Sequence, residues 1–304
     1  MERTAWDAAG GRRGRGRAGG MMPGYDSQSF RESSMKYRIL GKTNLRVSVI
    51  GMGTWQFGGE WGIDFAQEQV TPMFRRALEL GINLIDTAEC YGDHLSEKFI
   101  GEAIRDLGAD AREKFILATK CGHRFVAPFN RTEPRSGPDI QKQLDDSLHA
   151  LQTDYIDLYQ YHSWGDEQFE SQEVRAALEK AQAAGKIRHI GNSLGAGVKT
   201  SRQVDQSDAY HVEAIQVVYN RLQRSAEEIF FPGAQQRNLG VLARVPLASG
   251  LLSGKYKPGA KFPENDVRTK WQAAGMDERL AEVQKIAAEE VPRGVAMAHW
   301  ALAW

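Results

Sequence analysis

GINLIDTAECYG, residues 81–92, passes from the glycine that ends one predicted helix, through a short apolar strand, into a polar loop. The strand, Leu84–Ala88, carries Asp86 near its end, and the loop carries Tyr91. Apolar strands of this kind belong to parallel sheets whose outer face is covered by helices. The stretch therefore predicts one strand–helix unit of a parallel α/β fold.

The same alternation continues along the chain. The other strand candidates are FILATK (Phe115–Lys120), IDLYQYH (Ile156–His162), IRHIG (Ile187–Gly191), AIQVVY (Ala214–Tyr219) and VLARV (Val241–Val245). The predicted helices begin at Thr71–Pro72 and end at Gly81, run from Ser96 to Gly108, cover Ile140–Leu151, and cover Ala177–Ala181 before Gly185. Such alternation implies right-handed crossovers between parallel strands.

The segment before this region, residues 37–55, decides between two predicted folds, a barrel and an open doubly wound sheet. Tyr37–Leu40 and Leu45–Ile50, around a turn at Gly41–Asn44, predict a hairpin that runs into the first strand. The following segment, Gly51–Trp55, has no GxGxxG and leads into a loop rather than a helix, which removes the main support for a dinucleotide-binding open sheet. We predict an α/β fold, a (β/α)8-type TIM barrel with an N-terminal β-hairpin and about seven strands visible in this chain.

Composition limits the class of protein. The 304 residues include 39 Lys and Arg against 39 Asp and Glu, so the formal net charge is zero, which argues against nucleic acid as a partner. No apolar run approaches the roughly 20 residues of a membrane span, so no membrane partner is expected. The two cysteines, Cys90 and Cys121, are too few for a disulfide framework and fit a cytoplasmic protein.

Residues 1–34 differ from the rest of the chain. They contain GGRRGRGRAGG (residues 10–20) and almost no aliphatic side chains, so we expect a disordered basic, glycine-rich extension before one domain at 35–304. Nucleic-acid binding and a transit peptide remain alternatives for its arginines, although the segment has neither an apolar signal core nor an amphipathic pattern.

Four polar residues are placed for carbonyl chemistry. Asp86, Lys120 and His162 lie at or near the ends of successive strands, and Tyr91 follows in the loop after the first. The carboxyl ends of barrel strands open on one face, so these side chains should converge there. Hydride addition to a carbonyl leaves an alkoxide that needs a proton; a tyrosine can supply it when a lysine tunes its pKa, an aspartate anchors the lysine and a histidine polarises the carbonyl.

At these residues the sequence resembles the aldo-keto reductase family. The resemblance covers Met35 to the C-terminus, and its motifs are GINLIDTAECYG (81–92), FILATK, DYIDLYQYH (154–162), GKIRHIG (185–191), QVVYN (216–220) and PLASGLLSGKY (246–256). KFPENDVR (261–268) resembles the bacterial sugar- and inositol-related branch. The family's catalytic tetrad falls on Asp86, Tyr91, Lys120 and His162. The resemblance implies NADP(H), possibly NAD(H), bound across the barrel mouth, and a small-molecule aldehyde or ketone as substrate.

Further site residues are carried over from the family. Ser193 and Gln216 would hold the nicotinamide carboxamide. The other implied cofactor contacts are Gly53, Thr54, Trp55, Asp86, Arg244, Pro246, Leu247, Ser249, Leu251, Ser253 and Lys255. The implied substrate contacts are Trp55, Tyr91, His162 and Trp164, the two tryptophans forming walls of the ligand pocket.

The chain departs from the family pattern in three places. Leu194 follows Ser193 where the family usually has asparagine, so one carboxamide contact is expected to be lost. Arg244 stands where an aromatic residue usually stacks on the nicotinamide, although a planar guanidinium can also stack. The sequence ends at His299–Trp304, before the family's eighth strand and adenosine site. We therefore expect weak discrimination between NADPH and NADH.

Other interpretations use the same residues. Cys90, His94, Cys121 and His123 have no familiar zinc spacing, so we expect no metal. Lys120 could be the nucleophile of a Schiff-base aldolase. A channel-associated regulatory subunit that binds cofactor and turns over slowly, and an inactive truncated fragment, are the remaining alternatives. The physiological substrate, the direction of reaction and the oligomeric state are left open by the sequence.

Overall fold

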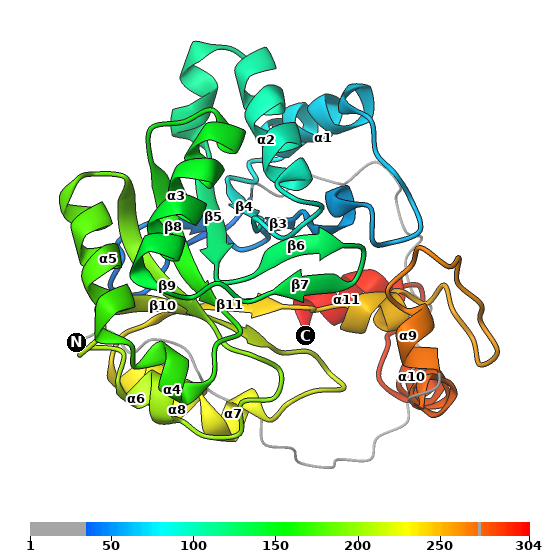
Figure 1. Cartoon of the computed structure of the whole chain (residues 1–304). Helices are drawn as coiled ribbons and strands as arrows, with labels where there is room; N and C mark the ends of the chain where they lie inside the picture. The colour runs from blue at the N-terminus through cyan, green and yellow to red at the C-terminus, as the bar shows by residue number, and fades with distance from the viewer. Residues whose placement is uncertain (1–34, 273–274) are drawn as a thin grey trace. The chain divides into compact units, whose positions relative to one another are not determined.

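The computed structural model describes residues 35–272 and 275–304, in which a parallel sheet of seven strands is the central element (Figure 1). The strands lie side by side in the order β11-β10-β9-β8-β5-β4-β3, and every neighbouring pair is parallel. Their bounds are β3 Met52–Gly53, β4 Leu84–Asp86, β5 Ile116–Cys121, β8 Ile156–His162, β9 Ile187–Ser193, β10 Val212–Val218 and β11 Gly240–Arg244. The sheet curls into a half-barrel of the TIM-barrel type, which confirms the predicted fold class.

Four long helices cover the outer face of the sheet, in the order in which the chain forms them (Figure 1). They are α1 Gln67–Glu79, α2 Leu95–Asp106, α3 Gly137–Leu151 and α5 Gln172–Ala183. The other helices are α4 Asp166–Phe169, α6 Arg202–Asp205, α7 Ala226–Ile229, α8 Phe231–Gln236, α9 Thr269–Gln272, α10 Met276–Glu289 and α11 Met297–Ala303, with short 3-10 helices η1 Trp55–Gly58, η2 Ala109–Lys114 and η3 Ala248–Ser253.

The expected start of the first helix is wrong, and its expected end is confirmed. The helix begins at Gln67 because the side chain of Gln69 accepts a hydrogen bond from the backbone N–H of Ala66 (2.9 Å) and satisfies a donor at that end. Pro72 therefore lies inside the helix, in its second turn, rather than at its first position. Gly81 has a φ of 75°, the left-handed conformation that ends a helix.

The predicted N-terminal hairpin is present and closes one end of the barrel. β1 (Tyr37–Ile39) pairs antiparallel with β2 (Arg46–Ser48). Leu40 and Val47 pack on side chains that point into the barrel. These interior side chains are Leu84, Ala118, Leu158 and Ala214, one each from β4, β5, β8 and β10. The sequence predicted that Leu45–Ile50 runs from the hairpin into the first strand of the sheet. In the structure that strand is instead the separate segment Met52–Gly53.

Because side chains alternate along a strand, the residues two positions further on point to the same interior. These positions are polar: Asp86 follows Leu84, Lys120 follows Ala118, Gln160 follows Leu158, and Gln216 follows Ala214. A dry layer of small and aliphatic side chains therefore supports a polar layer at the carboxyl ends of the strands.

Two features of the fold have no counterpart in the sequence predictions. An antiparallel hairpin, β6 (Arg124–Ala127) and β7 (Asn130–Thr132), stands after β5 (Figure 1). A separate apolar cluster joins the 247–262 segment to α10 and α11, away from the core between the sheet and its outer helices. The cluster consists of Ala248, Leu251, Leu252, Met276, Leu280, Val283, Ile286, Met297 and Ala301.

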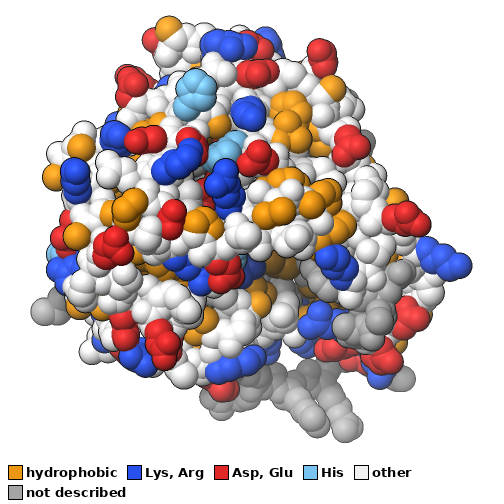
Figure 2. All heavy atoms as spheres, in the orientation of Figure 1, with side chains coloured by type: hydrophobic (Ala, Val, Ile, Leu, Met, Phe, Trp, Pro, Cys, Tyr) orange, Lys and Arg blue, Asp and Glu red, His pale blue; other side chains and the backbone are white. Residues whose placement is uncertain are grey.

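The expected extension at 1–34 lies outside the described residues. Within the described part of the chain, every helix is too short or too polar to cross a bilayer. Basic and acidic side chains intermingle over the face shown in Figure 2.

Candidate active site

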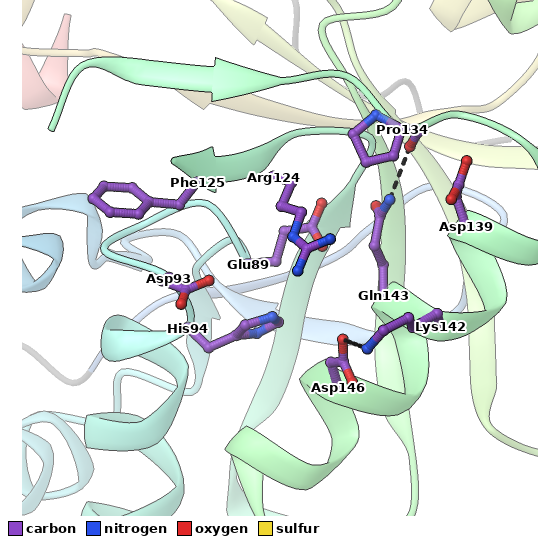
Figure 3. A pocket seen from close by; sticks show the side chains of 10 residues that line it. All are labelled: Glu89, Asp93, His94, Arg124, Phe125, Pro134, Asp139, Lys142, Gln143 and Asp146. Atoms are coloured by element: carbon purple, nitrogen blue, oxygen red, sulfur yellow. Dashed lines mark hydrogen bonds and ion pairs between the residues drawn. The ribbon is translucent and has the colours of Figure 1, made fainter. Parts of the chain in front are cut away.

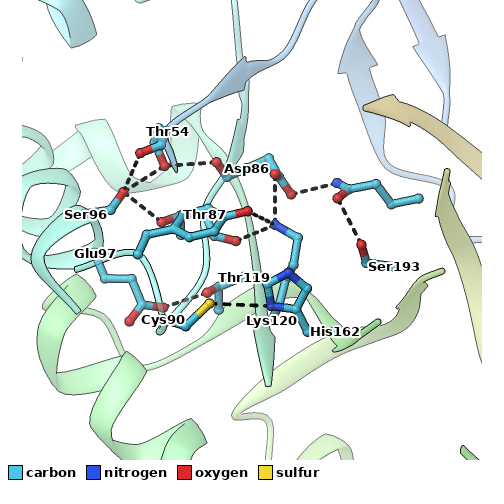
Figure 4. Close-up of polar contacts among 12 residues, drawn as sticks. Thr54, Asp86, Thr87, Cys90, Ser96, Glu97, Thr119, Lys120, His162 and Ser193 are labelled. Atoms are coloured by element: carbon cyan, nitrogen blue, oxygen red, sulfur yellow. Dashed lines mark hydrogen bonds and ion pairs between the residues drawn. The ribbon is translucent and has the colours of Figure 1, made fainter. Parts of the chain in front are cut away.

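Lys120 is the centre of the polar layer (Figure 4). Its Nζ donates to Asp86 Oδ2 (2.9 Å) and to the carbonyl oxygen of Thr87 (2.6 Å), and it lies 3.5 Å from the hydroxyl oxygen of Tyr91. The lysine is 1% exposed. The structure thus brings together three of the four residues expected to form the tetrad, around a single ammonium.

His162 borders the same group of side chains. Its ring lies edge-on to Tyr91, with 6.2 Å between centroids, and edge-on to His123, with 4.8 Å between centroids. Its Nδ1 is 3.8 Å from the sulfur of Cys90 (Figure 4). The contact with the thiol occupies Nδ1 and leaves Nε2 as the other polar atom of the ring.

Asp86 extends the network towards β9 and β10. Its Oδ1 accepts from Nε2 of Gln216 (2.8 Å), and Oε1 of Gln216 accepts from the hydroxyl of Ser193 (3.2 Å). The carboxylate therefore holds Lys120 on one oxygen and Gln216 on the other. Ser193 and Gln216, expected from the sequence to contact a cofactor, lie directly beside the Asp86–Lys120 pair.

The charges in this layer are set by burial and by one another. Burial alone would lower the pKa of Lys120, but the charge of Asp86, with Tyr91, outweighs it and holds that pKa above its ordinary value. Burial raises the pKa of Tyr91, against the opposing effect of the Lys120 charge. The phenol is therefore protonated at neutral pH and the amine is an ammonium. Of the two opposing effects on the pKa of Tyr91, burial is larger than the Lys120 charge expected from the sequence to tune it.

His162 is neutral for a similar reason. Burial lowers its pKa well below the ordinary range, and the positive charge of Lys120 lowers it further. A neutral imidazole can donate one N–H to an oxygen without adding a charge to the mouth.

The two tryptophans expected to form walls behave differently. Trp55 stacks on Tyr91, with 5.8 Å between ring centroids and 20° between planes. Trp164 is 1% exposed, and its Nε1 donates to the carbonyl of Cys121 (3.2 Å) while its ring packs edge-on against Tyr161. Trp164 is a core residue under the loop after β8, so the structure does not support its expected place in the substrate wall.

The expected cofactor contacts after β3 and β11 lie around the same mouth. Thr54 is buried and its N–H and hydroxyl both donate to the carbonyl of Asp86 (each 2.9 Å), while an added Cβ at Gly53 would meet nothing within 4 Å. Arg244 ends β11, and its Nη2 donates to the carbonyl of Leu194 (3.0 Å). Leu194, in the place of the usual asparagine, is 2% exposed and packs in the core.

In the segment 246–255, the expected cofactor contacts would be made by backbone groups more than by side chains. Ser249 and Gly250 have φ of 58° and 92°, so the turn η3 is kinked. The hydroxyl of Ser253 donates to the carbonyl of Gly250 (2.5 Å). Leu251 is 4% exposed and its side chain belongs to the C-terminal apolar cluster, so it could contact a cofactor only through its backbone. Pro246, Leu247 and Ser249 are partly exposed, and Lys255 is exposed.

A buried ion pair beside the mouth was missed by the sequence reasoning. Glu60 is fully buried; it accepts from Nε1 of Trp55 (2.8 Å) and from the N–H of Phe129 (2.6 Å), and it pairs with Arg131. Arg131 also donates to the carbonyl of Cys90 (3.2 Å). The only signal in the sequence was a lone glutamate in a glycine- and tryptophan-rich loop, which by itself predicts a solvated charge.

A cavity of about 240 Å³ lies outside this mouth, beside α3 and the β6–β7 hairpin (Figure 3). Its lining is Glu89, Asp93, His94, Arg124, Phe125, Pro134, Asp139, Lys142, Gln143 and Asp146, and includes none of the tetrad. Glu89, 3% exposed, accepts from the N–H groups of Gly122 and His123 (each 3.1 Å), and burial raises its pKa well above the ordinary value. The mixed charges of this lining indicate no particular ligand, so the cavity is not the candidate active site.

Comparisons with known proteins agree with this geometry. The model of the aldo/keto reductase family matches residues 49–304. The chain is 34% identical over 284 residues to the aldo-keto reductase YhdN of Bacillus subtilis, covering 89% of this chain and 81% of that protein.

Solved structures give the same result. The aldo-keto reductase AKR11C1 of Bacillus halodurans, in its holo form, superposes with a TM-score of 0.70 at 31% identity, over 88% of this chain and 81% of that one. The glycerol dehydrogenase AKR11B4 of Gluconobacter oxydans superposes with a TM-score of 0.68 at 28% identity, over 90% and 82%. The family match spans most of the chain and includes every strand of the sheet. The chain belongs to the aldo/keto reductase family and is an oxidoreductase.

Proposed function

We propose that this chain reduces the carbonyl of a small aldehyde or ketone to an alcohol with NADPH or NADH, and that Tyr91 is the proton donor. One observation carries the proposal: a buried ammonium, Nζ of Lys120, lies between the carboxylate of Asp86 and the hydroxyl of Tyr91 at the mouth of the barrel. Small-molecule sites of this fold lie at that face, where the strands end.

The residues at the mouth fit a nicotinamide. Nε of Arg244 is buried with no hydrogen-bond partner among the described residues, and the amide of Gln216 is held at the surface of the polar layer by Asp86. In the proposal, Ser193 and Gln216 bind the carboxamide of the ring, and the backbone of 246–255 follows the pyrophosphate. The bound cofactor supplies a hydride to the carbonyl carbon.

The protein then handles the proton. As the carbonyl oxygen gains negative charge, the hydroxyl of Tyr91 donates its proton to that oxygen, and the ammonium of Lys120 stabilises the tyrosinate that remains. His162, neutral, donates an N–H to the same oxygen and orients it. Asp86 keeps Lys120 charged and in place. Trp55, stacked on Tyr91, forms one wall of the substrate site.

The charge of Lys120 argues against the aldolase interpretation. A Schiff-base lysine must be an unprotonated amine, as a depressed pKa would make it. Here Asp86 and Tyr91 raise the pKa of Lys120. The two free and buried thiols, Cys90 and Cys121, fit a reducing compartment, and we infer the cytoplasm.

Replacement of the phenol tests the proposal. Tyr91→Phe keeps the ring that stacks on Trp55 and removes the proton donor, so we expect kcat for an aldehyde panel to fall by at least about 100-fold. The Kd of NADPH, from quenching of protein fluorescence, should stay within about threefold. Tyr155→Phe is the matched control, because that ring packs between the guanidinium groups of Arg112 and Arg188, away from the tetrad, and should leave kcat unchanged. Full carbonyl reduction by Tyr91→Phe would disprove the assigned donor.

A further inference from the structure

Arg244 is a cation in the mouth that forms no ion pair with a carboxylate among the described residues, 35–272 and 275–304. It ends β11, the strand next to the one that carries Gln216. Among the residues that the structure describes, its one hydrogen bond is from Nη2 to the carbonyl of Leu194 (3.0 Å), and no carboxylate lies within ion-pair distance. Its Nε is buried without a partner. A partly buried guanidinium whose Nε is shielded from water, and which contacts no carboxylate, responds to any further charge brought beside it.

The position of Arg244 places it beside the proposed ring site. The carbonyl that it binds belongs to Leu194, the residue after Ser193, and the N–H of Leu194 bonds to the carbonyl of Gln216 (2.9 Å). The side chains of Ser193 and Gln216 bond to each other. A ring whose carboxamide is held by that pair therefore lies next to the guanidinium.

The other charges nearby do not neutralise Arg244. The carboxylate of Asp86 is engaged by Lys120 on one oxygen and by Gln216 on the other. His162 is neutral, and Lys120 adds a second positive charge. Burial lowers the pKa of Arg244, and at neutral pH, where Tyr91 is protonated, the charge of Asp86 offsets this only in part.

We propose that Arg244 makes this site discriminate between the redox states of the cofactor, binding the neutral reduced nicotinamide more tightly than the positively charged oxidised ring. The proposal rests on the proposed function, because it requires a nicotinamide at the Ser193–Gln216 pair. The oxidised and reduced cofactors carry the same phosphates and differ by one formal charge on the ring. A fixed guanidinium against that ring repels only the oxidised form.

The consequence is a preferred direction. Tight binding of the reduced form and weak binding of the oxidised form favour carbonyl reduction and release of the oxidised product. An aromatic side chain at this position would act in the opposite sense, because the face of an aromatic ring attracts a cation.

The test is a ratio of two dissociation constants. We would measure the Kd of NADPH and of NADP+, by protein fluorescence and by calorimetry, for the wild type, Arg244→Gln and Arg244→Lys. Loss of the charge in Arg244→Gln should reduce the ratio Kd(NADP+)/Kd(NADPH) by about tenfold, mainly through tighter binding of NADP+. Arg244→Lys keeps the charge and should keep most of the ratio. Arg244→Met, also uncharged, should repeat the result of Arg244→Gln and guards against a folding defect in one variant.

The other outcomes overturn the inference in distinguishable ways. An unchanged ratio in Arg244→Gln and Arg244→Met, with both cofactors still bound, refutes the role of Arg244 and leaves the proposed function intact. An unchanged ratio with a raised KM only for carbonyl substrates that bear a carboxylate or phosphate would assign Arg244 to a substrate anion instead. Failure of the wild type to bind either cofactor would refute the proposed function together with this inference.

Discussion

Asp86 shows how much of this site depends on a single side chain. Its two oxygens hold the ammonium of Lys120 and the amide of Gln216, so one residue both keeps the lysine beside the proposed proton donor charged and fixes a proposed cofactor contact. The remaining ionisable groups take their state from burial: Tyr91 keeps its proton and His162 is neutral. The reaction proposed above therefore begins with every group in the required form at neutral pH.

The raised pKa of Tyr91 predicts a pH dependence with opposite signs in the two directions. Carbonyl reduction needs the protonated phenol, so kcat should be flat between pH 7 and about 9, below the raised pKa. Alcohol oxidation needs the tyrosinate, whose fraction grows about tenfold per pH unit in that range, so the oxidation rate should rise with pH. Initial rates in both directions, in buffers of constant ionic strength, check this.

The state of His162 gives the control for that measurement. Its pKa lies well below the ordinary value of 6.5, so no break in either profile should occur between pH 6 and 7. A break there that vanishes in His162→Gln would show that the histidine titrates in this range and would contradict a lowered pKa.

The sequence predicted those site residues whose role follows from their place at the end of a strand. Asp86, Lys120 and His162 were predictable because strand ends of a barrel share one face. Trp164 was not, because the residue after a strand can point into the mouth or under the loop, and its ring lies beneath Gly122, where an added Cβ would meet Nε1 of Trp164 at 2.2 Å. Glu60 was missed because burial of a loop carboxylate depends on partners from another segment.

Among the elements, the β6–β7 hairpin and η1 are connected to the candidate active site through one carboxylate, that of Glu60. Glu60 joins Trp55 of η1 to Arg131 of β7, and Arg131 reaches the carbonyl of Cys90, the residue before Tyr91. The stacking of Trp55 on Tyr91 is thus maintained by a contact between elements that lie far apart in the sequence.

Glu60→Gln should loosen this connection. The amide keeps one acceptor but leaves the guanidinium of Arg131 without its counter-charge, and we expect a loss of about 2–3 kcal/mol in the free energy of unfolding, below the value for a fully buried pair because Arg131 is partly exposed. The KM for the aldehyde should rise more than kcat falls, because the variant displaces the proposed substrate wall, Trp55, and leaves the proposed proton donor, Tyr91, in place.

The matched control is on the segment that follows the same hairpin. Glu133 is more than half exposed and pairs with Arg135, so Glu133→Gln should change stability by less than about 1 kcal/mol and leave KM as it is. Equal effects of the two substitutions, in urea denaturation and in KM, would show that Glu60 has no special role.

The elements themselves were predicted unevenly. The strand Ile156–His162 was located to the residue, and the other long strands to within one or two residues, because strands covered on both faces carry mainly apolar and aromatic side chains. The two-residue strand Met52–Gly53 and the β6–β7 hairpin were not, since a few exposed residues carry no periodicity. The start of α1 was misplaced because a proline near the start of a helix does not have to occupy its first position.

For the whole molecule, the layering inside the barrel links fold to function. The hairpin β1–β2 covers one end with Leu40 and Val47, an apolar layer follows, and the polar layer opens at the other end. This order follows from the alternation of side chains along parallel strands, so both the fold class and the face that carries the site could be predicted from the sequence. The packing of the C-terminal cluster could not, because it depends on contacts between segments that show no strand pattern.

Glu89 makes the stability of the molecule depend on pH in a predictable sense. Burial, with the nearby charge of Glu97, raises its pKa in the folded state well above the ordinary value of 4.5. Between pH 4.5 and that raised pKa the folded protein keeps a proton that the unfolded chain has lost, so the free energy of unfolding falls as pH rises through this window. Glu89→Gln carries no proton to lose, and its carbonyl oxygen can still accept from Gly122 and His123.

We therefore expect Glu89→Gln to be more stable than the wild type at pH 7 by about 1 kcal/mol or more, and the difference to shrink towards pH 4.5. The low pKa of His162 destabilises the folded state below pH 6.5, but equally in both proteins, so it cancels in the difference. Urea denaturation from pH 4.5 to 8 measures the difference, with the exposed Glu167→Gln as control. A variant that is less stable by a constant amount at every pH would mean that the N–H groups of Gly122 and His123 hold Glu89 ionised, so that it adds a buried negative charge to the lining of the cavity beside α3.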